Sequence, residues 1–96
     1  MSEVPKVWYM YVLRCKDNSL YCGVSNDVVR RFSEHQKMGK KTAKYLRGRG
    51  PLKLVFAMSI GTYSEALKAE REFKALTKQE KEVLIASQDF IFNETT

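Results

Sequence analysis

Three short apolar runs along the chain predict the strands of a sheet. Residues 7–15, with the sequence VWYMYVLRC, are aromatic or aliphatic almost throughout, and residues 20–24, LYCGV, follow after a short polar break. Runs of this length and composition are typical of buried strands, and the polar break between them is typical of a tight turn. We therefore expect an antiparallel hairpin, joined later in the chain by a third strand over residues 52–60.

The segments between and after these strands carry the signals of helix ends. Ser25 or Asn26 can cap a helix whose apolar stripe includes Phe32. Thr62 and Thr77 are each followed three residues later by glutamate, the capping-box pattern that opens a helix. The predicted helices span residues 26–37, 62–76 and 77–86. The resulting order β-β-α-β-α-α predicts an α+β fold, a small three-stranded antiparallel sheet flanked by helices.

The register of the hairpin decides whether Tyr11 and Tyr21 lie on one face of the sheet. Opposed residues of an antiparallel pair share a face, and faces alternate along each strand. A three-residue loop over 17–19 places Leu20 opposite Lys16 and puts both tyrosines on the same face. That loop requires one residue in the left-handed region. A two-residue turn instead puts the tyrosines on opposite faces.

The length and composition of the chain indicate one small domain. With 96 residues, of which 44% are hydrophobic and 29% charged, the composition is that of an ordinary globular protein. We expect a single domain over residues 1–86 and a C-terminal tail over 87–96. No run approaches the roughly 20 apolar residues that cross a bilayer, and residues 1–6 lack the apolar stretch of a signal peptide. We therefore expect no membrane association and a cytoplasmic location.

The cysteine and histidine content excludes two classes of protein. Two cysteines are too few for a disulfide scaffold, and together with a single histidine they cannot supply a four-ligand zinc site. In the register that unites the tyrosines, Cys22 opposes Arg14 and projects from the face opposite to Cys15. Sulfur atoms on opposite faces of a sheet cannot bond without distorting it, so we expect both thiols to stay reduced.

Positive charge is concentrated in the middle of the chain. The net charge is +6, but residues 30–53 hold nine Lys or Arg and one glutamate, so the remainder is slightly acidic. This distribution indicates a face that binds a polyanion, with a solvated lysine surface as the alternative. Residues 40–50 also contain two glycines and predict a loop with a short helical turn at 42–46. The candidate phosphate contacts are Lys37, Lys40, Lys41, Lys44, Arg47 and Arg49.

One carboxylate interrupts the apolar pattern of the helix predicted over 62–76. At 100° per residue, Glu70 falls in the middle of the apolar arc that extends from Ala69 to Leu67 and includes Ala66 and Phe73. A carboxylate aimed at a core costs several kcal/mol unless it is paired or binds a metal. Glu70 is therefore either a metal ligand at the floor of a cleft or one half of an ion pair with Lys74 at the rim of the core.

Two polar residues lie at the border of the apolar arc of the helix predicted over 26–37. Arg31 and His35 are four residues apart and so lie on the same side of that helix. A guanidinium can hold a phosphate by two hydrogen bonds, and an imidazole beside it can orient a hydroxyl or move a proton. A partly buried histidine with satisfied hydrogen bonds is the alternative for His35.

In order and spacing, these residues resemble the GIY-YIG endonuclease superfamily, in particular its small stand-alone bacterial members. The two motifs that give the superfamily its name are represented by Tyr9-Met10-Tyr11 and Tyr21-Cys22-Gly23. The loop over 42–51 is similar to a basic loop of the small members. The resemblance covers residues 7–84.

The resemblance implies a catalytic role for five side chains. They are Tyr11, Tyr21, Arg31, His35 and Glu70. Arg31, ten residues after Tyr21, matches an arginine that would hold a phosphate oxygen, and Tyr11 would activate the attacking water. Tyr21 and His35 would orient that water and tune Tyr11. Glu70 matches a glutamate that would bind one divalent ion, Mg²⁺ or Mn²⁺.

The implied activity is hydrolysis of nucleic-acid phosphodiesters. Gly23 would allow the backbone close to a phosphate, and the basic residues would grip flanking phosphates without reading sequence. With no separate recognition domain, the resemblance implies selection of a nucleic-acid structure, DNA more than RNA, in repair or recombination. The oligomeric state is left open.

Two departures from the family pattern keep other functions open. Tyr9 stands where the family name has glycine, and the asparagine near the end of many family domains has no clear match, since Asn93 lies far into the tail. One alternative is a nucleic-acid-binding module with weak or no turnover. Another is a basic accessory protein that associates with RNA.

Overall fold

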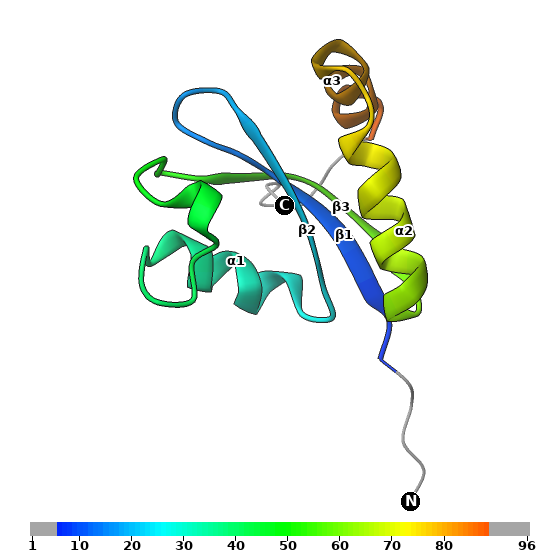
Figure 1. The fold of residues 1–96 in the computed structure, drawn as a ribbon, viewed down its shortest axis with the longest axis horizontal. Helices are drawn as coiled ribbons and strands as arrows, with labels where there is room; N and C mark the ends of the chain where they lie inside the picture. The colour runs from blue at the N-terminus through cyan, green and yellow to red at the C-terminus, as the bar shows by residue number, and fades with distance from the viewer. Residues whose placement is uncertain (1–5, 89–96) are drawn as a thin grey trace, which may run out of the picture.

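A three-stranded antiparallel sheet lies between two layers of helix in the computed structural model, which describes residues 6–88 (Figure 1). The elements are β1 (Trp8–Arg14), β2 (Leu20–Ser25), α1 (Val28–Gln36), the 3₁₀ helix η1 (Lys44–Leu46), β3 (Lys53–Gly61), α2 (Tyr63–Lys74) and α3 (Lys78–Ser87). The strand order β2-β1-β3 makes β1 central and leaves β2 and β3 as edges. The predicted fold class and order of elements are confirmed.

The alternation of side chains along β1 divides the interior into two cores. Tyr11 and Leu13 belong to a buried cluster with Leu46 of η1 on the side of α1. Val12 projects from the opposite face and belongs to a second cluster with Phe73 of α2. Figure 1 shows α1 and α2 on opposite sides of the sheet. Both faces are therefore buried, as the nearly continuous apolar strand predicts.

The hairpin between β1 and β2 closes one residue earlier than predicted. The Cys15 N–H donates to the Ser19 carbonyl (2.8 Å), so the three-residue loop comprises residues 16–18. Lys16 accounts for the shift, because its N–H donates to the Arg49 carbonyl (2.9 Å) and is not available to β2.

The shift preserves the face that each tyrosine occupies. Leu20 opposes Arg14, and Asn18 supplies the left-handed residue with a φ of 73°. Moving a loop by one residue moves the pairing by two, and side chains repeat with a period of two. Tyr11 and Tyr21 therefore share a face, as the three-residue loop predicts.

The cysteine prediction is correct in its outcome and wrong in one detail. Cys22 opposes Val12, two residues from the predicted partner Arg14. It still projects from the face opposite to Cys15. Both cysteines are buried and free.

The helix N-termini follow the predicted chemistry, with one correction. Thr62 and Thr77 each form a complete capping box with the glutamate three residues later. The cap of α1 is Asp27, where Ser25 or Asn26 was predicted. The Ser25 hydroxyl instead accepts a hydrogen bond from the Asp27 N–H (2.9 Å), which orients the cap.

An ion pair fixes α3 against the end of β1. The Arg14 guanidinium donates two hydrogen bonds to the Glu82 carboxylate, each 2.7 Å long, and Lys78 lies 3.4 Å from the same carboxylate. The hydrogen bonds from Arg14 lower the pKa of Glu82 to about 2. This bidentate geometry is the strong form of the pair, and it holds α3 beside the sheet.

The free edge of β3 is covered at one point by Gln88. The Ala57 N–H donates to Gln88 Oε1 (3.4 Å), and Gln88 Nε2 donates to the Ala57 carbonyl (3.2 Å). The rest of the predicted tail, with Asn93, lies outside the described residues. Within residues 6–88, no helix is long and apolar enough to cross a membrane.

Candidate active site

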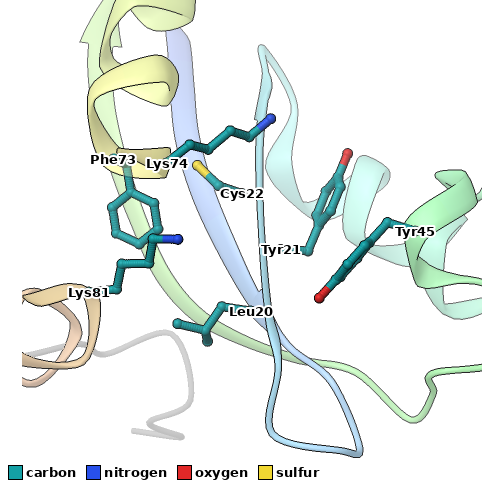
Figure 2. A pocket seen from close by; sticks show the side chains of 7 residues that line it. All are labelled: Leu20, Tyr21, Cys22, Tyr45, Phe73, Lys74 and Lys81. Atoms are coloured by element: carbon teal, nitrogen blue, oxygen red, sulfur yellow. The ribbon is translucent and has the colours of Figure 1, made fainter. Parts of the chain in front are cut away.

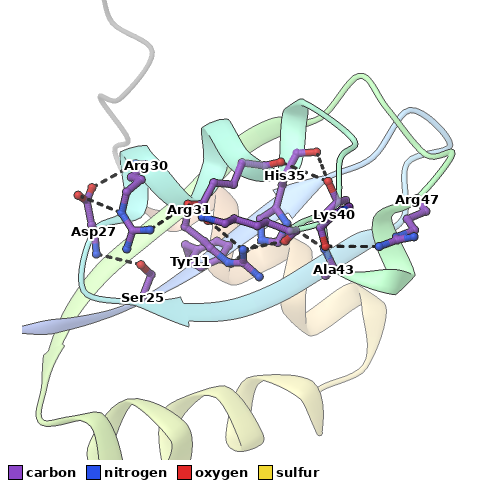
Figure 3. A network of polar contacts seen from close by, with 12 residues as sticks. Tyr11, Ser25, Asp27, Arg30, Arg31, His35, Lys40, Ala43 and Arg47 are labelled. Atoms are coloured by element: carbon purple, nitrogen blue, oxygen red, sulfur yellow. Dashed lines mark hydrogen bonds and ion pairs between the residues drawn. The ribbon is translucent and has the colours of Figure 1, made fainter.

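Tyr11 and His35 form a buried hydrogen bond between β1 and α1. Tyr11 Oη lies 2.9 Å from His35 Nε2, and the two residues are 1% and 0% exposed. On the other side of the imidazole, the Ala43 N–H donates to His35 Nδ1 (3.2 Å). Figure 3 shows Tyr11, His35 and Ala43 within the polar network along α1. The histidine is thereby fixed at both ring nitrogens.

These two contacts assign the tautomer of His35. A backbone N–H can only donate, so Nδ1 must carry a free lone pair. The neutral imidazole therefore carries its proton on Nε2 and donates it to Tyr11 Oη. The hydroxyl proton of Tyr11 is consequently free to donate elsewhere, to a water or a phosphate oxygen.

The protonation states of the pair follow from burial. Burial, reinforced by the positive charge of Arg31, lowers the pKa of His35 from 6.5 to about 4. Burial and the neighbouring Tyr21 raise the pKa of Tyr11, and the opposing effect of Arg31 is smaller. At neutral pH the imidazole is uncharged and the phenol keeps its proton. A general base at Tyr11 requires a shift of its pKa in the other direction.

We expect acid to destabilise the protein through His35 before the carboxylates titrate. The pKa of His35 in the folded protein, about 4, lies below its ordinary value of 6.5. Between pH 6.5 and pH 4, His35 is therefore protonated in the unfolded chain but neutral in the folded protein. Stability therefore falls as the pH falls, by about 2 kcal/mol between about pH 7.5 and pH 5. Urea unfolding at both pH values measures it.

His35→Gln is the control for this expectation, because the sequence has no other histidine. The variant should lose most of the pH dependence in that window. An NMR titration that gives His35 an ordinary pKa would contradict the assignment.

Arg31 is held at the border of the same cluster by α1 and the basic loop. Its Nη1 donates to Glu34 Oε1 (3.0 Å) and to the Lys41 carbonyl (2.8 Å). The side chain remains 29% exposed, so the guanidinium is oriented but accessible to an anion. Its charge is close enough to lower the pKa of both Tyr11 and His35.

Tyr21 lies between the two helical layers at the edge strand β2. Its ring centroid is 5.5 Å from that of His35 and 6.4 Å from that of Tyr11. Burial raises the pKa of Tyr21, the charges of Arg31 and Lys74 oppose this effect, and Glu70 adds to it. Charged residues from both sides of the sheet therefore affect the pKa of Tyr21.

Glu70 approaches β2 from the α2 side. Its Oε2 is 3.0 Å from Lys74 Nζ, and its side chain is 19% exposed. The ion pair with Lys74 is one of the two alternatives that the helical pattern predicts for Glu70. Glu70 also contributes to raising the pKa of Cys22 to about 12, after the larger effect of burial. The carboxylate therefore lies near β2, on the face that carries Cys22.

The five predicted catalytic residues thus fall into two groups around one edge strand. Four gather on the α1 side, namely Tyr11, Tyr21, Arg31 and His35. Glu70 comes from the other side of β2 and is electrostatically coupled to Tyr21.

A divalent ion fits this site only with one protein carboxylate. Among residues 6–88, no three Asp, Glu, His or Cys side chains lie together as metal ligands. Mg²⁺ is commonly held by one or two carboxylates together with waters and substrate phosphates. Glu70 is the carboxylate that could contribute to a site of this kind, and in the structure it is paired with Lys74.

Gly23 makes room for the hydroxyl of Tyr11. The two residues oppose each other in the β1–β2 pair, and a Cβ added at Gly23 would lie 2.6 Å from Tyr11 Oη. Any side chain at this position would displace the phenol from His35. The observed contact accounts for a glycine here without invoking a phosphate.

The predicted phosphate contacts lie in the segment that runs from the end of α1 through η1. Five of the six are exposed, namely Lys37, Lys40, Lys41, Lys44 and Arg47. Arg49 is partly engaged, since its Nη1 lies 2.6 Å from Asp17 Oδ2 and its guanidinium is 4.4 Å from the centroid of the Tyr45 ring. A phosphate at Arg49 would therefore share the guanidinium with the Asp17 carboxylate.

Two residues that shape the site were not predicted from the sequence. Glu34 binds Arg31 and also Arg30 (2.9 Å), and it is the one acid in the basic segment, three residues from Arg31. Tyr45 stacks on Tyr21 at 6.0 Å. An aromatic residue among cations is a signal for nucleic-acid contact, and it was present in the loop.

Comparison with known proteins assigns the class to which this fold and cluster belong. The model of the GIY-YIG catalytic domain matches residues 7–83. The chain belongs to the GIY-YIG family.

Within that family, the chain is similar to UPF0213 proteins. A UPF0213 protein of Cronobacter sakazakii is 52% identical over 81 residues, covering 84% of this chain and 83% of the relative. One of Vibrio cholerae is 48% identical over 87 residues, covering 90% and 84%.

Two solution NMR structures have the same fold. The UPF0213 protein of Bacillus halodurans has a TM-score of 0.53 at 42% identity and covers 83% of each chain. A protein of E. faecalis has a TM-score of 0.56 at 38% identity, covering 88% of this chain and 90% of that one.

Proposed function

We propose that this chain is a cytoplasmic, divalent-metal-dependent endonuclease that hydrolyses phosphodiesters of DNA with structural rather than sequence selectivity. A role in DNA repair or recombination is part of the proposal. The observation that carries it is the buried Tyr11–His35 hydrogen bond beside an oriented, accessible Arg31. The match to the GIY-YIG catalytic domain supports the same reaction class.

In the proposed mechanism, Arg31 binds the phosphate. Glu34 and the Lys41 carbonyl fix one end of its guanidinium (3.0 and 2.8 Å), which leaves other N–H groups for non-bridging oxygens. Charge that develops on these oxygens in the transition state is then stabilised by a group that needs no reorganisation.

Tyr11 orients the attacking water or a phosphate oxygen as a hydrogen-bond donor. Its free hydroxyl proton and its raised pKa favour this role over that of general base. His35 holds Tyr11 Oη by a hydrogen bond, and the ring of Tyr21, on β2, packs against the imidazole. This revises the role that the family resemblance implies for Tyr11.

Glu70 is the proposed ligand for one Mg²⁺ or Mn²⁺ ion. When bound, the ion supplies stabilisation of the leaving 3′-oxygen. Lys74 must release the carboxylate at least in part, and its ammonium is then free to contact a phosphate.

A cleavage panel tests the proposed function. Single-stranded, duplex, flap and branched DNA, with matched RNAs, are incubated with Mg²⁺, Mn²⁺ or EDTA. We expect metal-dependent cleavage that differs among DNA structures and not among sequences. Binding of DNA without cleavage under every condition would support the alternative of a binding module, for which the Glu70–Lys74 ion pair is the favouring observation.

Binding should depend steeply on salt through the exposed lysines. If about four to six of the basic residues neutralise phosphates on a duplex, log K should fall against log[salt] with a slope of roughly −4 to −5. Replacing both Lys40 and Lys41 by alanine should reduce the slope by up to about two units and weaken binding to all sequences alike. Titrations at several salt concentrations measure both effects, and a flat dependence would identify the segment as a solvated surface.

A further inference from the structure

An open pocket runs along the free edge of β2, between the two helical layers. Its volume is about 240 Å³, and its walls include Tyr21 and Tyr45 on one side and Phe73, Lys74 and Lys81 on the other (Figure 2). Pockets for drug-sized ligands measure roughly 300–1,000 Å³. This one therefore suits a single planar group rather than a stacked pair.

The wall on the η1 side is an exposed aromatic platform. The rings of Tyr21 and Tyr45 are nearly parallel, with an interplanar angle of 24° and centroids 6.0 Å apart. Tyr45 is 44% exposed although it is a large ring. Its orientation is fixed, because Arg49 lies against the ring and donates to the Tyr45 carbonyl (2.7 Å). A rigid, exposed ring is a stacking surface that needs little ordering on binding.

The opposite wall combines apolar surface with positive charge. Lys81 Nζ lies 5.7 Å from the centroid of the Phe73 ring, and Lys74 extends toward β2 from α2 (Figure 2). Cys22 adds a thiol that stays neutral, since burial raises its pKa to about 12. The described lining contains no carboxylate. The charge of Lys74 is balanced by Glu70, 3.0 Å away, so Lys81 is the cation that this apolar slot offers to an aromatic group attached to a phosphate.

The floor of the pocket offers hydrogen-bonding groups. β2 is an edge strand, and an edge strand presents backbone N–H and C=O groups that pair with no other strand. Backbone groups of this kind can form hydrogen bonds with the polar edge of a nucleobase. Tyr21 belongs to both this pocket and the catalytic cluster, so a ligand here is adjacent to a phosphate at Arg31.

We propose that this pocket binds one unpaired nucleobase of the nucleic-acid strand, stacked against Tyr45 beside the phosphate that Arg31 holds. The inference rests on the proposed function and deepens it. It names an unstacked base as the structural feature that the protein selects, because a base within a duplex cannot enter the slot.

Fluorescence anisotropy in EDTA tests the proposal without cleavage. The probes are a labelled oligothymidylate and an abasic oligomer of the same length and charge. Stacking on an aromatic side chain changes affinity by roughly 5- to 150-fold per base, so wild-type protein should prefer the base-containing oligomer by a factor in this range. Tyr45→Ala should abolish the preference for the base-containing oligomer, while Tyr45→Phe should retain it.

Tyr63→Ala is the matched control. Tyr63 is similarly exposed (52%) and packs against Trp8 with tilted rings whose centroids are 4.6 Å apart. Its replacement should leave the preference intact. Equal binding of both oligomers by wild-type protein, or a preference that survives Tyr45→Ala, would overturn the proposal.

The outcome is separable from that of the proposed function. Base-dependent binding without cleavage refutes the nuclease and supports the pocket. Cleavage together with base-independent binding supports the nuclease and refutes the pocket.

Discussion

Replacing Glu70 by glutamine should lower the rate of DNA cleavage by at least about 10²- to 10³-fold and leave DNA binding intact. Glutamine keeps the size of the side chain but loses the charge that a divalent ion requires. The fold should survive, because the Glu70–Lys74 pair is a single ion pair at a partly exposed position. Cleavage rates across a range of Mg²⁺ concentrations and thermal denaturation measure the two effects.

Glu72→Gln provides the comparison within α2. Glu72 is exposed and two residues away, so its replacement should leave cleavage within about twofold. Full activity in Glu70→Gln would mean that the Glu70–Lys74 pair is only a structural contact at the rim of the core.

Replacing Arg31 by lysine should reduce cleavage by about 10²- to 10³-fold, with a small change in binding. Lysine keeps the positive charge but lacks the planar fork that can bind Glu34 and a phosphate together. The contact matters most in the transition state, so kcat should fall much more than binding affinity. Single-turnover cleavage and equilibrium binding of the same DNA separate the two quantities.

Arg30→Lys is the control for Arg31→Lys. Arg30 is the preceding residue of α1, shares Glu34 as a partner, and is 57% exposed. It should retain nearly full cleavage. Equal losses of binding and cleavage in Arg31→Lys would make Arg31 one more phosphate anchor.

The fold was predictable because its elements have strong local signals. The two capping boxes fixed the starts of α2 and α3, and the apolar runs fixed the strands. The position of the hairpin loop was not predictable, since it depends on a hydrogen bond from Lys16 to Arg49, which is distant in sequence. From the sequence, a three-residue loop placed both tyrosines on one face of the sheet and a two-residue turn placed them on opposite faces. The structure has a three-residue loop, one residue earlier than predicted.

The sequence could nominate residues for the candidate site but could not give their protonation states. Helical geometry singled out Glu70 and paired it with Lys74 as one alternative, which the structure contains. The state of Tyr11 could not be inferred, because it depends on the N–H of Ala43, which sets the tautomer of His35. Burial of the phenol, which raises its pKa, is likewise a property of tertiary packing.

The Gln88 amide on the open edge of β3 bears on the behaviour of the protein in concentrated solution. An unpaired strand edge is a template on which a second chain can add a strand and begin aggregation. Gln88 occupies the Ala57 N–H and carbonyl with its own donor and acceptor, as a neighbouring strand would. Two molecules can join continuously along β3 only after this amide has been displaced. The side chain thus blocks strand addition at a point of β3 where, among the described residues, no second strand pairs with this edge.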